Sequence, residues 1–164
     1  MNYHNITKDD MLNGDGLRVV LWLAGCTHCC DGCQNPQTWD ASGGIEFDKK
    51  AEDELFEALA QDHISGITFS GGDPLHPFNR ETVLELAKKV KTQFKNKTVW
   101  MYTGFLWEEV KKAIDLTNID VLVDGEFKKE LHDNNLKWVG SSNQRIIDVQ
   151  KSLKEDKVVL HCEQ

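Results

Sequence analysis

The chain has 164 residues, of which 40% are hydrophobic and 28% are charged, a length and composition typical of one globular domain rather than a disordered chain. The formal net charge is −8 and the Lys and Arg residues are scattered, so the sequence lacks the basic face with which proteins bind nucleic acids. No apolar run is long enough to span a membrane, and residues 1–10 lack the apolar stretch of a secretory signal. We therefore expect a single domain over residues 1–164 in the cytoplasm, with neither nucleic acid nor a membrane as its partner.

Predicted strands and helices alternate along most of the chain. Residues 17–24 are nearly all apolar, as expected for a strand covered on both faces, and residues 48–61 carry an apolar helical face. We predict strands at residues 17–24, 67–69, 98–102, 119–123 and 158–160, and helices at residues 48–61, 79–94 and 106–116. A polar loop around residues 141–145 precedes the last of these strands.

This alternation predicts an α/β fold with a mostly parallel sheet and right-handed crossovers. A complete barrel of eight strand–helix units takes about 250 residues, so we expect a partial (β/α) barrel or an open, curved sheet with the helices outside. Ligands of such sheets bind at the carboxyl ends of the strands. Four loops follow predicted strands and should share this rim: the cysteine-rich loop, Gly71–Pro74, Thr103–Gly104 and Asp124–Gly125.

Cysteine placement is the strongest signal in the sequence. Four of the five cysteines lie within residues 26–33, and such a tight cluster in a cytosolic protein indicates a metal site rather than a disulfide scaffold. Cys26, Cys30 and Cys33 follow the spacing C-x₃-C-x₂-C, with Cys29 as an additional thiol in the first gap. Thiolates are the usual ligands of iron–sulfur clusters, which commonly take four. Three ligands would leave one iron open to a substrate.

Two other interpretations use the same thiols. All four cysteines, or three of them with His28, could close a tetrahedral zinc site, although such sites usually combine two short ligand pairs from separate segments. Alternatively, Cys26 with Cys29, or Cys30 with Cys33, could form a redox dithiol, which would leave the other pair without a role. The spacing favours the cluster and leaves both alternatives open.

The other rim loops carry candidate ligand contacts. Gly71 and Gly72 would let a ligand approach the backbone, and Asp73 or the exposed amides could hold an amino-acid headgroup, although a glycine pair is more often a simple turn. Tyr102 is more often a packing residue than a cofactor contact. His28 could hydrogen-bond a cluster sulfur or its surroundings, although a lone loop histidine is more often plain surface.

Taken together, the C-x₃-C-x₂-C loop and Gly71–Gly72–Asp73–Pro74 resemble the signatures of the radical S-adenosylmethionine family, with Asp73 at a position where that family more often has Glu. A closer resemblance is to the glycyl-radical activases that act on the anaerobic ribonucleoside-triphosphate reductase. It is carried by Gly25–Cys26–Thr27–His28, Cys30–Asp31–Gly32–Cys33, and residues 35–39, 120–125 and 140–145.

The resemblance implies a radical-S-adenosylmethionine-type fold, a four-iron four-sulfur (4Fe–4S) cluster on Cys26, Cys30 and Cys33, and S-adenosylmethionine on its fourth iron. It implies that an electron from a flavodoxin-type donor cleaves S-adenosylmethionine to a 5′-deoxyadenosyl radical, which forms a glycyl radical on the reductase. The implied cofactor contacts are Gly71, Gly72, Asp73, Tyr102 and Thr103, with His28, Asn143 and Arg145 as further candidates around the site.

Three alternatives remain at this point. The first is an activase for another glycyl-radical enzyme, of the pyruvate formate-lyase type. The second is a zinc-stabilised binding module without catalysis, and the third is an electron carrier with Cys29 as the fourth cluster ligand. A partial barrel would leave the site open on one side for a glycine-bearing loop of a protein substrate, unless the tail of the chain closes the rim.

Overall fold

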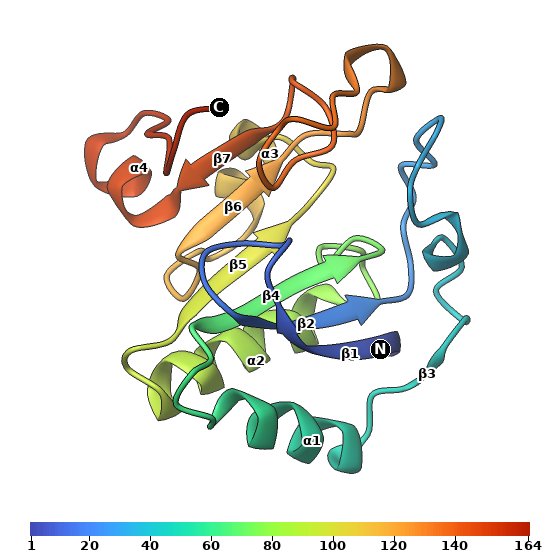
Figure 1. Ribbon diagram of the computed structural model, residues 1–164, viewed down its shortest axis with the longest axis vertical. Helices are drawn as coiled ribbons and strands as arrows, with labels where there is room; N and C mark the ends of the chain where they lie inside the picture. The colour runs from blue at the N-terminus through green and yellow to red at the C-terminus, as the bar shows by residue number, and fades with distance from the viewer.

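The computed structural model describes residues 1–164 and shows one seven-stranded sheet in the order β3-β1-β2-β4-β5-β6-β7 (Figure 1). The strands are β1 (Asn2–Asp10), β2 (Arg18–Leu23), β3 (Ile45–Glu46), β4 (Gly66–Gly71), β5 (Thr98–Tyr102), β6 (Val121–Asp124) and β7 (Arg145–Asp148). The helices are α1 (Lys49–Leu59), α2 (Arg80–Gln93), α3 (Trp107–Ala113) and α4 (Val149–Glu155), with short 3₁₀ turns at Pro36–Thr38 and Lys129–Leu131. None of the helices combines the length and apolar character that crossing a bilayer requires.

The centre of the sheet is parallel and its edges are antiparallel. Strands β2, β4, β5 and β6 run parallel, whereas β1 and β3 on one side and β7 on the other are antiparallel to their neighbours. The prediction of an α/β fold is confirmed, whereas the sheet is less parallel than predicted because β1, β3 and β7 are antiparallel to their neighbours. The sheet is open, with β3 and β7 at its two edges, so no closed barrel forms.

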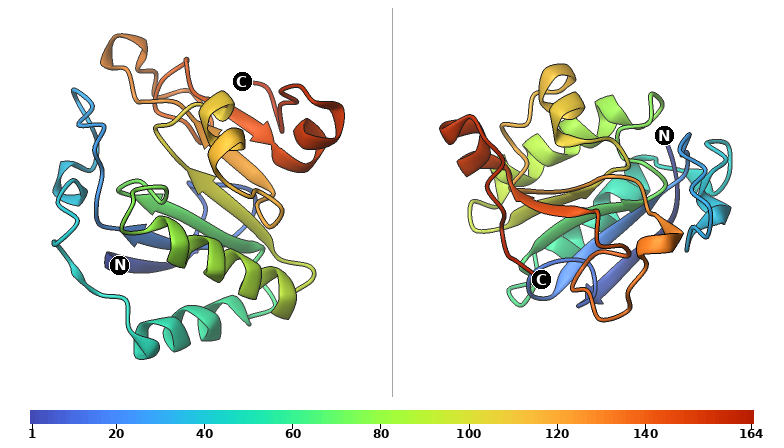
Figure 2. Two further views of the ribbon diagram at one scale, coloured as in Figure 1. Left: turned by 180° about the vertical axis from the view of Figure 1, so that it is seen from behind. Right: turned by 90° about the horizontal axis from the view of Figure 1, so that it is seen from above.

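The two faces of the sheet are covered differently. Helices α1, α2 and α3 pack on one face, where 26 buried side chains form the main core (Figure 2). Leu21 of β2 and Phe69 of β4 point into this core because alternate strand residues face opposite sides. The other face carries a small apolar cluster around Trp100 and is covered by loops rather than helices. That face is where a ligand can reach the sheet.

The end of the chain differs from the prediction. Residues 158–160 do not form a strand, and only an isolated bridge joins Leu160 to Ile147. The last strand is instead β7, which overlaps the predicted polar loop, and α4 follows it directly because the Asp148 carboxylate accepts a hydrogen bond from the N–H of Lys151 at 3.0 Å. Strand β7 has only two buried isoleucines, with a polar residue at each end, so its sequence does not contain an apolar run long enough to predict a strand. Strand β1, which lies between β3 and β2, was not predicted for the same reason, since polar residues dominate it.

A buried arginine ties the amino ends of three parallel strands together. Arg18, at the start of β2, is fully buried and donates through Nε to the Thr68 hydroxyl at 2.8 Å. Its other guanidinium nitrogens donate to the Thr98 hydroxyl at 2.9 Å and to the carbonyl oxygens of Ile67 and Thr98, each at 2.8 Å. Burial lowers the pKa of Arg18 to about 10, so the side chain remains charged at neutral pH.

Replacing Arg18 with Met should destabilise the protein by about 3 kcal/mol, because the buried hydroxyl and carbonyl oxygens around it lose their donors. Urea unfolding monitored by circular dichroism measures this loss. Lys154→Met, which removes an exposed cation from α4, is the control and should change stability by less than about 0.5 kcal/mol. Equal stabilities of the two variants would contradict a structural role for Arg18.

Candidate functional site

A cavity of about 720 Å³ lies at the carboxyl ends of the parallel strands, on the sheet face that the helices leave free. As the sequence predicted, all four rim loops contribute to it. Its lining includes Cys26, His28, Cys30, Cys33, Gly71, Gly72, Asp73, Tyr102, Thr103, Gly104, Gly125 and Glu126. Residues 10–13, before β2, and residues 136–140, after β6, form two further walls.

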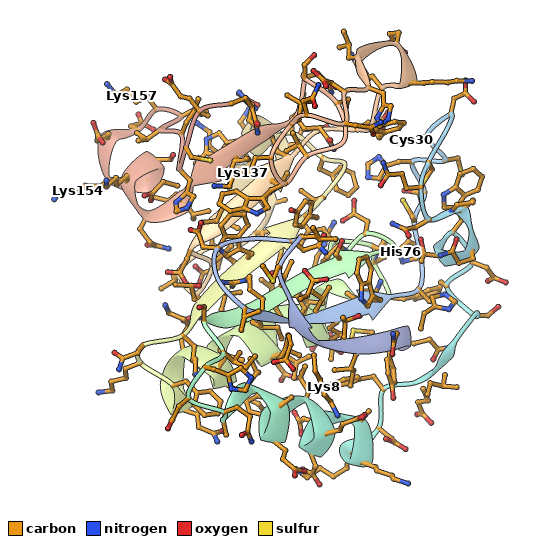
Figure 3. The ribbon with its side chains drawn as sticks, viewed as in Figure 1. Lys8, Cys30, His76, Lys137, Lys154 and Lys157 are labelled. Carbon is orange, nitrogen blue, oxygen red and sulfur yellow. The ribbon has the colours of Figure 1, made fainter.

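The cysteine loop leaves β2 at Gly25 and is anchored at its base. The N–H of Gly25 donates to the Thr38 carbonyl at 2.6 Å, and the N–H of Cys26 donates to the Trp39 carbonyl at 3.1 Å. Gly32 takes a φ of +74°, which favours glycine, and it packs against the Lys129 side chain. Cys30 accordingly lies where the loop approaches the chain that follows β6 (Figure 3).

Three of the four clustered thiols face the cavity and one does not. Cys26, Cys30 and Cys33 line it and are half-buried, whereas Cys29 is exposed, has a φ of +50° and is not part of the lining. Burial raises the pKa of the Cys26 thiol to about 11 and also raises the pKa of Cys30. Both thiols are therefore protonated at neutral pH without a metal, and a ligated metal would displace their protons.

Three thiols of the cysteine loop line one cavity without meeting at a single point. As the side chains stand, no three His, Cys, Asp or Glu residues converge on one point as the ligands of a tetrahedral zinc ion do. In a four-iron cluster each thiolate binds a different iron, and the ligands need not meet at one point. Three thiols that line one cavity, with the N–H of Asn35 donating to the Cys33 sulfur at 3.3 Å, fit such a cluster.

The glycine pair is explained by close backbone contact. A Cβ atom at Gly71, whose φ is +94°, would lie 2.6 Å from the backbone nitrogen of Leu23, and a Cβ at Gly72 would lie 2.5 Å from the Gly25 carbonyl oxygen. The N–H groups of Gly72 and Asp73 donate to the carbonyls of Leu23 and Gly25 at 2.8 and 2.7 Å. The pair therefore joins the end of β4 to the start of the cysteine loop, and both glycines also line the cavity.

Asp73 holds a buried carboxylate, 3% exposed, that accepts hydrogen bonds from three loops. Its own loop supplies the N–H of Leu75 at 2.9 Å. The loop after β5 supplies the Thr103 hydroxyl, at 2.9 and 3.0 Å from the two carboxylate oxygens, and the N–H of Gly104 at 3.0 Å. The cysteine loop supplies Nε2 of His28 at 2.7 Å.

His28 lies inside the site, with a side chain that is 8% exposed, and not on plain surface. Its Nδ1 is 2.9 Å from Oε1 of Glu126, and its ring meets Phe105 edge-on with centroids 4.6 Å apart. The hydrogen bond to Asp73, opposed by burial and supported by Glu126, raises the pKa of His28 to about 9. The imidazole therefore carries both protons at neutral pH and donates to both carboxylates.

The remaining predicted site residues divide into two groups. Tyr102 and Thr103 line the cavity, with the Tyr102 hydroxyl donating to the Trp138 carbonyl at 2.6 Å. Asn143 and Arg145 do not line it. Asn143 donates to the Glu126 carbonyl at 2.8 Å, and Arg145 is paired with Asp124 and Glu108, so both order the chain beside β6.

Several cavity residues were not found from the sequence. Glu126, which fixes His28, follows a predicted strand and could have been included because its neighbours Asp124 and Gly125 were placed at the rim. Met11 and Leu12 give no local signal, since the polar segment that contains them reaches the cavity only through the pairing of β1 with β2. Cys162 packs beside the Trp100 cluster and is not part of the cavity.

Residues 12–147 match the family described as "4Fe-4S single cluster domain". The match contains the whole cysteine loop and all four parallel strands, so the fold and the site define a domain that carries one four-iron cluster.

Relatives narrow this class to one family. The anaerobic ribonucleoside-triphosphate reductase-activating protein of Enterobacteria phage T4 is 43% identical over 146 residues, which cover 89% of this chain and 93% of the phage protein. The protein of the same name from Haemophilus influenzae is 43% identical over 150 residues, which cover 89% of this chain and 97% of the relative. That from Escherichia coli K12 is 42% identical over 150 residues, which cover 88% of this chain and 96% of the relative. The chain belongs to this family of activating proteins.

We expect Cys29→Ala to retain the cluster, because the Cys29 thiol is exposed and does not line the cavity, and alanine replacement of Cys26, Cys30 or Cys33 to abolish it. Iron and sulfide content and the visible absorption of protein reconstituted without oxygen measure this difference. A colourless Cys29→Ala protein would contradict the three-thiol assignment and support the electron carrier.

Proposed function

We propose that this chain is a single-domain glycyl-radical activase of the radical S-adenosylmethionine type, and that its substrate is an anaerobic ribonucleoside-triphosphate reductase. The observation that supports this most strongly is that Cys26, Cys30 and Cys33 line the same cavity as Gly71 and Gly72, in a chain related throughout to proteins named as activators of that reductase. We place the protein in the cytoplasm, where thiols stay reduced.

With a 4Fe–4S cluster and S-adenosylmethionine bound, one electron from a flavodoxin-type donor would break the sulfonium carbon–sulfur bond, releasing methionine and a 5′-deoxyadenosyl radical that takes a hydrogen atom from a glycine of the reductase. The chain's own residues hold and enclose these groups. Cys26, Cys30 and Cys33 supply thiolates, and the missing side chains at Gly71 and Gly72 let the end of β4 lie close against the start of the cysteine loop. Gly71, Gly72, Asp73, Tyr102 and Thr103 form the wall against which S-adenosylmethionine would lie.

The open side of the cavity supports a protein substrate. Residues 145–164 do not line the cavity, so the end of the chain does not close the rim. The mouth is bounded instead by residues 10–13 and 136–140, and Met11 and Leu12 on the first of these walls are 69% and 79% exposed. The Asp10 carboxylate fixes this turn by accepting from the N–H groups of Leu12 and Asn13 at 2.8 and 2.9 Å. A rigid apolar lip of this kind suits contact with another protein.

The function is tested by reducing the reconstituted protein without oxygen, adding S-adenosylmethionine and the reductase, and measuring 5′-deoxyadenosine together with the electron paramagnetic resonance signal of a glycyl radical. Both products should appear, and the radical should require the reductase. A pyruvate formate-lyase type enzyme offered in its place should remain without a radical; a radical on that enzyme alone would favour the other class of activase. A protein with its cluster intact that leaves S-adenosylmethionine uncleaved beside the reductase would overturn the proposal.

Replacing both Met11 and Leu12 with Ser should lower the yield of glycyl radical per 5′-deoxyadenosine formed by about tenfold, because the protein substrate loses its apolar contact at the mouth. The ratio is measured by combining quantitative electron paramagnetic resonance with chromatography. Leu153→Ser, at an exposed leucine of α4, is the matched control and should leave the ratio unchanged. An unchanged ratio in the Met11 and Leu12 variant would exclude the lip as a contact surface.

A further inference from the structure

The tip of the cysteine loop has few connections to the rest of the chain. No backbone hydrogen bond joins residues 27–32 to any residue outside the loop; the backbone bonds at Gly25, Cys26 and Thr38 lie at its base. Apart from the Phe127 N–H, which faces the Cys30 thiol, the hydrogen bonds that leave the tip are those of the His28 ring. The His28 side chain therefore makes most of the hydrogen bonds that connect the tip to the rest of the chain.

His28 contacts each of the other three rim loops. Its two ring nitrogens reach Asp73 after β4 and Glu126 after β6, at 2.7 and 2.9 Å. Its ring packs on Phe105 and Gly104 after β5, so closely that a Cβ atom at Gly104 would lie 2.6 to 2.7 Å from three ring atoms. No other side chain of the cysteine loop makes a comparable set of contacts.

The Asp73 carboxylate has all its acceptor positions occupied by donors from these loops. A carboxylate has about four lone-pair positions, and the Leu75 N–H, the Thr103 hydroxyl, the Gly104 N–H and His28 Nε2 occupy them. No position remains for the ammonium group of an amino acid. Its buried charge instead fixes the imidazole.

We propose that Asp73, His28 and Glu126 form a latch that holds the cysteine loop in the conformation that presents Cys26, Cys30 and Cys33 to one cavity. Asp73 and His28 are thus positioning residues for cluster binding, and Gly104 belongs to the latch because only glycine leaves room for the ring. This inference rests on the proposed ligation of the cluster by these three thiols.

The latch is tested on the full-length, cluster-loaded protein by the rate at which a chelator removes its iron. His28→Ala should lose iron about tenfold faster than the wild type, since residues that orient metal ligands commonly contribute that much. His28→Gln, which keeps an amide donor, should lose iron at a rate between those of the wild type and His28→Ala. His63→Ala removes a histidine paired with Asp9 at an exposed site away from the cavity and should behave as the wild type. Rates for His28→Ala within twofold of the wild type would overturn the latch.

Gly104→Ala perturbs the latch without changing His28 and covers the case in which His28→Ala does not fold. It should also speed iron loss, and it should add nothing in a His28→Ala background, where the space for its Cβ atom is free. Additive effects in the double variant would overturn the proposed contact. Far-UV circular dichroism confirms that the fold is unchanged.

The electron paramagnetic resonance spectrum of the reduced cluster gives a second readout, because an altered ligand arrangement shifts its g values whereas a general loss of stability does not. The shift should occur in His28→Ala and Gly104→Ala and be absent in His63→Ala. None of these measurements uses S-adenosylmethionine. A wild-type protein that holds iron but leaves S-adenosylmethionine uncleaved would overturn the proposed function alone, and normal iron loss in both latch variants would overturn the latch alone.

Discussion

The Asp73 carboxylate is almost completely buried, and a buried charge is costly unless hydrogen-bond donors surround it. Its own loop provides one donor, the N–H of Leu75, and the others belong to the loops after β5 and β2. These loops must therefore converge before the charge is stabilised. The requirement draws the cysteine loop across the carboxyl edge of the sheet, and it determines which thiols face the cavity and which one remains outside.

The parallel centre of the sheet could be predicted because its strands are buried on both faces and so appear as continuous apolar segments. Strands β2, β4, β5 and β6 all overlap predicted ones. The antiparallel strands β1 and β7 could not be found in this way, since each mixes polar with apolar residues instead of forming a continuous apolar segment. The final strand was placed too late because Val158 and Val159 are apolar, although they only flank an isolated bridge after α4.

The candidate site was predictable wherever its chemistry is local in the sequence. The cysteine spacing and the glycine pair are short patterns, and the rule that ligands bind at the carboxyl ends of strands brought their loops together. The partnership of His28 with Glu126 spans 98 positions and depends on strand order, which no local pattern contains. For Arg145 the local sequence was misleading. It lies in a stretch that resembles the activases, so it was predicted near the cofactor, but it pairs with the buried Asp124 of β6 instead.

The aspartate at position 73, where the resembling family more often has glutamate, follows from the same geometry. An aspartate can accept a hydrogen bond from the N–H two residues later in the chain, and the Leu75 N–H makes this bond at 2.9 Å. A glutamate carries its carboxylate one methylene further from the backbone. It would leave that N–H without a partner and press against Thr103 and Gly104, which already lie about 3 Å from the carboxylate. The shorter side chain thus keeps the charge between the loops, at the distance where His28 can reach it from the cysteine loop.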